Sequence, residues 1–124
     1  MKVIYCAGSI SDPNGAQCAR NIERGKQWAA RIMDAGFAVY SPHSDGGVVG
    51  RTSLSLQEVY DMSKAILLKC DAMFVMPLSD SSPGTQGEIA FCGEHGIPVF
   101  TQMQELGKWA TGERLRAAYG DFEG

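Results

Sequence analysis

The sequence predicts an α/β fold, a small doubly wound parallel sheet of about four strands with helices on both faces. Short apolar runs typical of strands alternate along the chain with segments that repeat apolar residues at helical spacing. Strands joined through helices form right-handed parallel units. With strand order 2-1-3-4, as in Rossmann or flavodoxin-like sheets, the loops after the first and third strands flank one crevice.

The first part of the chain predicts two strands with one helix between them. Residues 2–7 are rich in Val, Ile and Tyr and predict the first strand. Pro13 suits the first turn of a helix. Gly36 is expected to end this helix, and a second strand follows over 37–40. Residues 41–54 predict a long loop. The apolar residues that recur at helical spacing in the first helix are Ile22, Ala29, Ile32 and Met33.

A capping box, Ser55-x-x-Glu58, opens the next helix, which precedes a third strand over 72–76. This helix is expected to present Val59, Met62, Ile66 and Leu67 on one face.

The last part of the chain predicts two more helices around one strand. The first runs from about Thr85 to Glu94 and ends near Gly96. A fourth strand over 97–100 follows. A second capping-box pattern, Thr101-x-x-Gln104, opens the final helix. Its glycines, Gly107 and Gly112, are expected to divide it in two.

Composition predicts one folded domain spanning residues 1–124, with 44% hydrophobic and 20% charged residues. The net charge of −3 and the lack of a basic run argue against binding to polymeric nucleic acid. The four cysteines form no Cys-x-x-Cys pair and the two histidines stand apart, which predicts reduced thiols and no metal site. Without a signal-peptide pattern or an apolar stretch of about 18 residues, we expect a cytoplasmic protein that does not enter the membrane.

Two small-residue segments follow the first and third strands, and the topology predicts that they meet. Gly8-Ser9-Ile10-Ser11 is the first, and residues 81–88 are the second. Small residues admit a ligand close to the backbone, and the N–H groups of a helix start favour phosphate. Glu88 is expected in the first helical turn, beside whatever the second segment holds. A phosphate cradle next to a carboxylate suggests chemistry on a phosphorylated sugar.

Each of these residues also has a structural explanation. Thr85-x-x-Glu88 is itself a capping box, and Gly8-Ser9 could be an ordinary turn that lacks the third glycine of a dinucleotide site. Asp61 could be a solvated surface acid. The long glycine-rich loop is a possible lid or ligand wall, carrying His43, Asp45 and Arg51.

Four motifs together resemble the nucleoside 2-deoxyribosyltransferase-like superfamily over residues 2–100, and the chain looks most like its small phage and bacterial members. In order they are Ile4-Tyr5-Cys6-Ala7-Gly8-Ser9-Ile10, Asp61-Met62-Ser63-Lys64-Ala65-Ile66, Asp71-Ala72-Met73-Phe74-Val75 and Ser82-x-Gly84-Thr85-x-x-Glu88.

The resemblance implies roles for particular residues. Glu88 matches the nucleophile, Tyr5 the tyrosine that orients it, and Asp61 is the nearest match to an aspartate that faces the base. Ser82 matches a serine that donates to phosphate in the nucleotide hydrolases, where the transferases have an acid. The expected substrate contacts are Gly8, Ser9, Ile10, Ser82, Gly84 and Thr85.

The function expected from this resemblance is an N-glycosidase that cleaves the base–sugar bond of a (deoxy)ribonucleoside 5′-monophosphate and needs no cofactor. One alternative is a 2-deoxyribosyltransferase on free deoxynucleosides. An alternative from another class is a non-catalytic nucleotide-binding module. A homodimer or larger homo-oligomer is also expected, with Trp28 and Trp109 as candidate apolar anchors.

Overall fold

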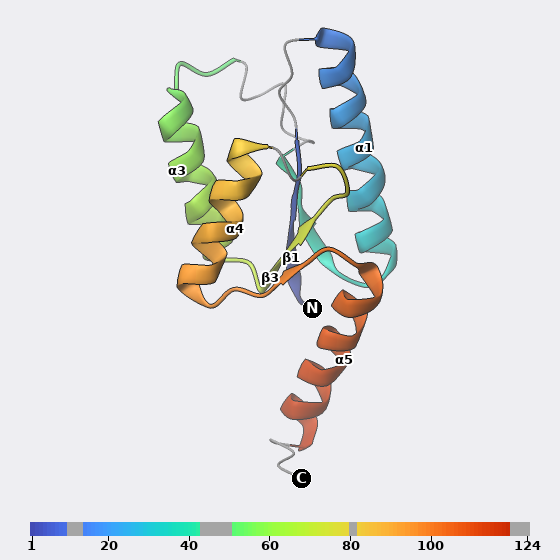
Figure 1. The fold of residues 1–124 in the computed structure, drawn as a ribbon. Helices are drawn as coiled ribbons and strands as arrows, with labels where there is room; N and C mark the ends of the chain where they lie inside the picture. The colour runs from blue at the N-terminus through green and yellow to red at the C-terminus, as the bar shows by residue number, and fades with distance from the viewer. Residues whose placement is uncertain (10–13, 43–50, 80–81, 120–124) are drawn as a thin grey trace.

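The structure is a computed structural model that describes residues 1–9, 14–42, 51–79 and 82–119. Four parallel strands form its sheet in the order β2-β1-β3-β4, which confirms the predicted α/β fold and strand order (Figure 1). The bounds are Val3–Ala7 for β1, Ala38–Tyr40 for β2, Ala72–Val75 for β3 and Val99–Phe100 for β4.

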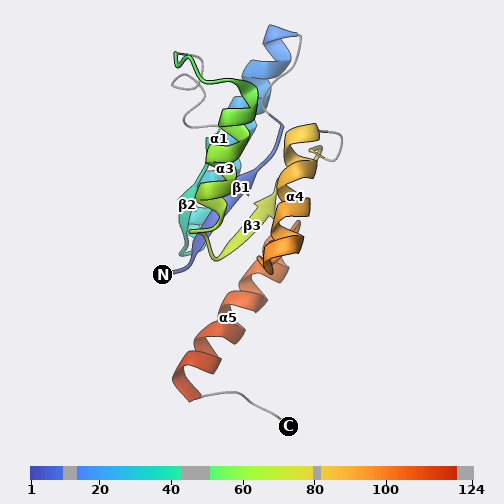
Figure 2. The same ribbon diagram turned by 90° about the vertical axis from the view of Figure 1, so that its left-hand side faces the viewer.

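Helices cover both faces of the sheet. One face packs against α1 and the start of α5, and the other against α3 and α4, as two perpendicular views show (Figures 1 and 2). The bounds are Gly15–Asp34 for α1, Leu56–Leu67 for α3, Pro83–His95 for α4 and Met103–Tyr119 for α5. Within the described residues, no helix is both long and apolar enough to cross a membrane.

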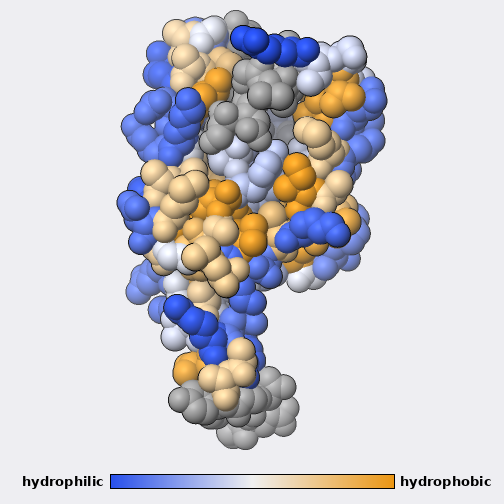
Figure 3. All heavy atoms as spheres, turned by 180° about the vertical axis from the view of Figure 1, so that it is seen from behind, coloured by the Kyte–Doolittle hydropathy of each residue, from blue (hydrophilic) through white to orange (hydrophobic). Residues whose placement is uncertain are grey.

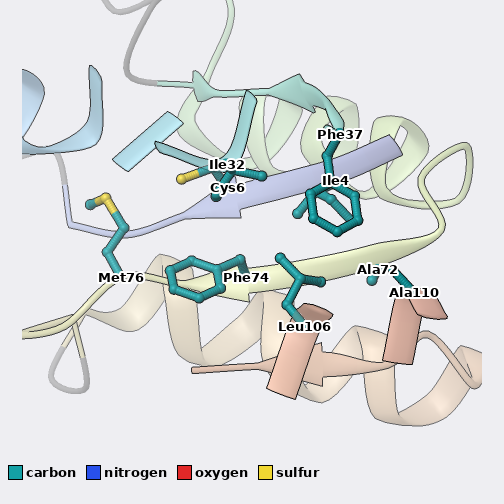
Figure 4. Close-up of a cluster of buried hydrophobic side chains, with 9 residues drawn as sticks. All are labelled: Ile4, Cys6, Ile32, Phe37, Ala72, Phe74, Met76, Leu106 and Ala110. Carbon is teal, nitrogen blue, oxygen red and sulfur yellow. The ribbon is translucent and has the colours of Figure 1, made fainter. Parts of the chain in front are cut away.

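Two hydrophobic cores lie on the two faces. The core on the α1 and α5 face includes Ile4, Phe74 and Leu106, all without exposed surface (Figure 4). The core on the other face includes Leu67 of α3 and Cys92 of α4. The alternation of strand residues between the two faces therefore explains why β1 and β3 are almost wholly buried.

Both tryptophans belong to the first core. Trp28 packs on Phe74 with ring centroids 5.3 Å apart, and Trp109 packs on Phe100 at 5.5 Å. They remain partly exposed. Seen from behind, apolar residues gather between the charged flanks of α1 and α3, over the sheet edge that β2 forms (Figure 3).

The starts of α1 and α3 follow their local signals. Asn14 caps α1 by accepting from the N–H of Ala16 at 2.9 Å, while Pro13 lies outside the described residues. The predicted capping box of Ser55 and Glu58 is confirmed, with both bonds at 3.1 Å. Not every residue predicted on an apolar helix face is buried, however, since half of Met33 and more than a third of Met62 are exposed.

The two C-terminal helices differ from the prediction. α4 begins at Pro83, two residues earlier than expected, and ends at Gly96 in the left-handed conformation with φ 67°. α5 begins at Met103, so Thr101 does not cap it. It also runs unbroken through Gly107 and Gly112. Each glycine costs roughly 1 kcal/mol in a helix, which the burial of neighbouring Leu106 and Ala110 against the sheet offsets.

Candidate functional site

The segments that are expected to flank a crevice come together where β1 and β3 end. The N–H of Ser9 donates to Ser79 Oγ at 3.2 Å, and the N–H of Met76 donates to the carbonyl of Ala7 at 2.9 Å. Ser79 has no exposed surface. Ser79 links the two predicted segments, because its carbonyl also accepts from the N–H of Ser82 at 3.1 Å. Ile10, Ser11 and Ser81 lie outside the described residues.

Gly8 allows these segments to approach one another. A Cβ built on Gly8 would lie 2.1 Å from Met76 Cε and 3.0 Å from Ser79 Oγ. Because Met76 is only 1% exposed, its side chain has little room to move away. Glycine at this position thus has a packing reason independent of any ligand.

The N-terminus of α4 forms the opposite wall. Ser82 is its N-cap and accepts from the N–H of Thr85 at 3.3 Å, and Pro83 occupies the first helical position. The bond to Thr85 uses a lone pair of Ser82 Oγ. The Ser82 hydroxyl can therefore still donate its proton to an anion.

The capping explanation of Glu88 is wrong. Thr85 lies inside α4 and is 1% exposed, so it cannot be the cap of a Thr85-x-x-Glu88 box. The expected first-turn position is also wrong, because a helix that begins at Pro83 places Glu88 in its second turn. Gly84 likewise lies in the first turn of α4 and not in a loop. The missed signal was the cap at Ser82, followed by proline.

Glu88 and Tyr5 share a largely buried environment. Burial raises the pKa of Glu88, and an interaction with the Tyr5 hydroxyl partly opposes that rise. The pKa of Tyr5, which has no exposed surface, is raised by burial and then by the Glu88 carboxylate. Neither the Tyr5 hydroxyl nor Glu88 Oε2 makes a hydrogen bond of standard geometry. The fold thus brings the strand tyrosine and the helix glutamate together.

Further polar atoms near this end of the sheet are buried without a hydrogen-bond partner. They include Thr85 Oγ1 and the Oγ of Ser41, which directly follows β2. Ser41 is 6% exposed. Buried polar groups are normally hydrogen-bonded, and exceptions gather at functional sites. Buried polar atoms without a partner therefore gather at this end of the sheet on both of its faces, which marks it as the candidate site.

Two residues of α3 that sequence reasoning missed face this site. The ring of Tyr60 packs over Gly84, where a Cβ would lie 3.4 Å from Tyr60 Cε1. Ser63 donates to the carbonyl of Val59 at 3.1 Å and lies close enough to Tyr5 to oppose the rise in its pKa. Helical spacing could have found both, because they lie seven and four residues before the buried Leu67.

Among the described residues, two of the remaining predicted side chains, Asp61 and Arg51, are exposed and have no contact with Glu88. Asp61 lies on the exposed side of α3, where its Oδ1 accepts from Gln57 Nε2 at 2.9 Å. Arg51 is exposed, five residues before α3 begins. His43 and Asp45 lie outside the described residues.

The cysteines are free thiols, as predicted. Burial raises the pKa of Cys6 to about 12 and that of Cys92 to about 11. Among the described residues, no group of three or more His, Cys, Asp or Glu side chains could hold a metal ion.

A comparison with curated proteins finds no match to this chain. A family model does match, over residues 2–101 and therefore over most of the chain. Its description is a domain of unknown function, DUF4406, and the protein belongs to that family.

Proposed function

We propose that the protein is an N-glycosidase that cleaves the base–sugar bond of a (deoxy)ribonucleoside 5′-monophosphate. The observation that carries the proposal is the Glu88 carboxylate beside the buried Tyr5 hydroxyl, at the crevice where β1 and β3 end. Crevices at such topological switch points are where open α/β sheets bind ligands. A desolvated carboxylate in this position suits attack on a cationic sugar carbon.

The chemistry needs one nucleophilic oxygen and one water. Glu88 attacks C1′ as the bond from C1′ to the base nitrogen breaks, and the base leaves with the bonding electrons and takes up a proton from solvent. Water then attacks C1′ and cleaves its bond to the Glu88 oxygen, which restores the carboxylate, returns one proton to solvent and releases the sugar 5-phosphate. The carboxylate also stabilises the positive charge that develops at C1′.

Tyr5 supports this role by keeping the nucleophile ionised. A buried carboxyl group favours its neutral form, which is a poor nucleophile. Interaction with the Tyr5 hydroxyl lowers the pKa of Glu88 against the effect of burial. We infer that Tyr5 orients the carboxylate and raises its ionised fraction.

The phosphate end of the site rests on α4 and on the segment after β1. The capping geometry of Ser82 leaves its O–H able to donate to phosphate, in the field of the helix N-terminus. Gly8 and Ser9 lie across the crevice. The N–H of Ser9 already donates to Ser79, so we do not expect it to donate to phosphate as well.

Asp61 has less support than the other implied residues. The Asp61 side chain is exposed and accepts a hydrogen bond from Gln57. This position does not support a role for Asp61 in protonating the leaving base. Tyr60, one residue earlier, faces α4 and is the better candidate to contact the base side of the ligand.

Base release from nucleotides and nucleosides tests the proposal. The protein is incubated with a panel of 5′-monophosphates and with the matching free nucleosides, each with and without a second base as acceptor. We expect free base from a monophosphate without acceptor. Product only with acceptor and free deoxynucleoside would identify the transferase. Binding without release from any substrate would identify a nucleotide-binding module.

A further inference from the structure

A stripe of polar residues on α1 packs inward instead of facing water. Asn21 is 4% exposed, and its Oδ1 accepts from Gln17 Nε2 at 2.9 Å and from Arg24 Nη2 at 3.5 Å. The Nε of Arg24 is buried and has no hydrogen-bond partner. The helix therefore holds one guanidinium group in a fixed, partly buried position.

Arg24 has no acidic partner among the described residues. Within the described part of the chain, no carboxylate lies within ion-pair distance of Arg24. Asn21, the side chain that orients it, is neutral. Partly buried charges are normally paired, because desolvation without a partner is costly. An arginine in this state fits an anion supplied from outside the chain.

The packing of α1 places Arg24 level with the end of the sheet where β1 and β3 finish. Trp28, one turn after Arg24, packs on Phe74 of β3. Because α1 runs opposite to the strands, moving back from Trp28 to Arg24 leads about 6 Å towards the strand ends. Moving from Phe74 to Met76 leads a similar distance the same way. Arg24 is therefore level with Met76, whose Cε would lie 2.1 Å from a Cβ built on Gly8.

A second orphaned group lies at the same end of the sheet. Ser41 follows Tyr40, which pairs with Tyr5, so Ser41 continues the strand beside Cys6. Its buried Oγ has no partner. Together with Ser79, Ser41 and Arg24 give the α1 side of the crevice a polar lining, in a core that is otherwise apolar.

We propose that Arg24, oriented by Asn21, binds the phosphate group of the ligand and selects the 5′-monophosphate over the free nucleoside. This inference rests on the proposed function, whose phosphate contacts it extends from α4 to α1. A guanidinium group offers a planar pair of donors that matches phosphate oxygens. Neutral hydroxyls at Ser82 and Ser9 would then be complemented by one positive charge.

Calorimetric titration of the full chain tests the role of Arg24. The probes are the tightest-binding 5′-monophosphate of the panel, its free nucleoside and inorganic phosphate, titrated in a Glu88→Gln background that keeps the nucleotide intact. We expect Arg24→Gln to weaken binding of the monophosphate at least about tenfold, because a charge-assisted hydrogen bond is lost. Binding of the free nucleoside should stay within about twofold.

Arg20→Gln is the matched control. Arg20 lies one turn earlier on α1, is exposed, and donates to Gln17. Its loss should leave monophosphate binding within about twofold. An equal loss in both variants would show a general effect of charge and would overturn the assignment. So would unchanged binding in Arg24→Gln, or a parent protein that prefers free nucleoside.

Two more variants separate binding from folding. Arg24→Lys keeps the cation and should recover part of the lost affinity, whereas a lysine variant as weak as the glutamine variant overturns the proposal. Arg24→Met keeps the apolar stem of the side chain. It is used in place of Arg24→Gln if circular dichroism shows that Arg24→Gln is unfolded. Because these titrations need no turnover, Arg24-dependent binding without base release would reject the glycosidase and leave the phosphate contact standing.

Discussion

At the level of single residues, Glu88 carries most of the proposed chemistry. Glu88→Gln should lower base release by several orders of magnitude, because the amide cannot form the covalent intermediate. The side chain keeps its shape, so the circular dichroism spectrum should not change. Rates of base release from the best monophosphate, compared with the parent under single-turnover conditions, check this. Equal turnover in the two proteins would remove Glu88 from the mechanism.

The burial of the Glu88 carboxylate should also change the thermal stability of Glu88→Gln relative to the parent protein. The pKa of Glu88 is raised in the folded protein, so the native state binds this proton more tightly than the unfolded chain. The stability that this proton contributes is present below the ordinary glutamate pKa of about 4.3 and is lost as pH rises from there through the raised pKa of the folded protein. Glu88→Gln should be more stable than the parent at pH 7, and this advantage should shrink at about pH 4. Melting curves at both values decide it.

Tyr5 is expected to set the pH dependence of the reaction. Because its hydroxyl lowers the pKa of Glu88, Tyr5→Phe should raise that pKa further. Ionised Glu88 then forms only at higher pH, so the acid limb of the kcat/KM profile should move upwards. The profile of base release for parent and variant is the measurement. A loss of activity with an unmoved acid limb would show that Tyr5 acts through packing alone.

At the level of elements, Ser82 decides the electrostatics at the start of α4. Aspartate caps helices as well as serine does, so Ser82→Asp should keep the fold. Its charge would oppose a phosphate dianion by about 1 to 4 kcal/mol at 4 Å, depending on the local dielectric. We expect monophosphate binding to weaken at least tenfold and binding of free nucleoside to be spared. Calorimetric titration of both ligands into both proteins measures it.

Ser82→Asn provides the control for shape and capping. Asparagine is also a good N-cap and is neutral. Ser82→Asn should therefore weaken monophosphate binding much less than Ser82→Asp does. If the two variants weaken binding equally, the effect is steric, and the electrostatic explanation is wrong.

The elements whose signals are local were predicted well. The cap and the partner that define the start of α3, Ser55 and Glu58, lie three residues apart in the sequence. The start of α4 was misplaced because two overlapping patterns were available, Ser82 before Pro83 and Thr85 before Glu88. Only packing distinguishes them, since Thr85 is buried inside the helix.

Properties that depend on tertiary contacts could not be predicted. Met33 has the right spacing for the apolar face of α1 but lies at its last turn, and half of it is exposed. Arg24 and Ser41 have polar side chains that suggest exposure, yet they carry buried atoms. The pairing of Tyr5 with Glu88 joins residues 83 positions apart. The sequence suggested it through resemblance, and the register of the sheet supplies it physically.

At the level of the whole molecule, the strand order determines where the site forms. The chain adds strands towards one edge of the sheet from β1 to β2 and towards the other edge from β3 to β4. The ends of β1 and β3 therefore bring Gly8, Ser79 and Ser82 around one crevice. α3 and α4 cover this end of the sheet from one face, and α1 covers the other face. This arrangement explains why short motifs scattered over most of the chain converge on one site.

The second half of α5 stands apart from this body. Its first turns pack on the sheet through Leu106 and Ala110, whereas the helix continues beyond the sheet (Figure 2). Leu115 in that part is 45% exposed. The contacts at this end include an ion pair between Lys2 and Glu113 at 3.9 Å and one between Glu113 and Arg116.

The prediction of a homodimer or larger assembly belongs to this scale. The structure changes the residues on which it can rest, because Trp28 and Trp109 pack against their own core and expose only part of their rings. Large apolar side chains with greater exposure lie at the start of α3, where Leu54 is 42% and Leu56 is 66% exposed. Exposed apolar residues near one another favour contact with a partner.

Sedimentation velocity at micromolar concentration measures the assembly, with base release followed at the same concentrations. We expect a species of at least twice the 13.4 kDa mass of the chain. Leu56→Lys should shift it towards monomer, because burying a lysine in an apolar contact is unfavourable, whereas Leu115→Lys on α5 serves as the matched control. If the partner completes the site, activity should fall on dilution together with the dimer. A clean 13.4 kDa monomer that still releases base would exclude a shared active site and leave the crevice of one chain sufficient for the reaction.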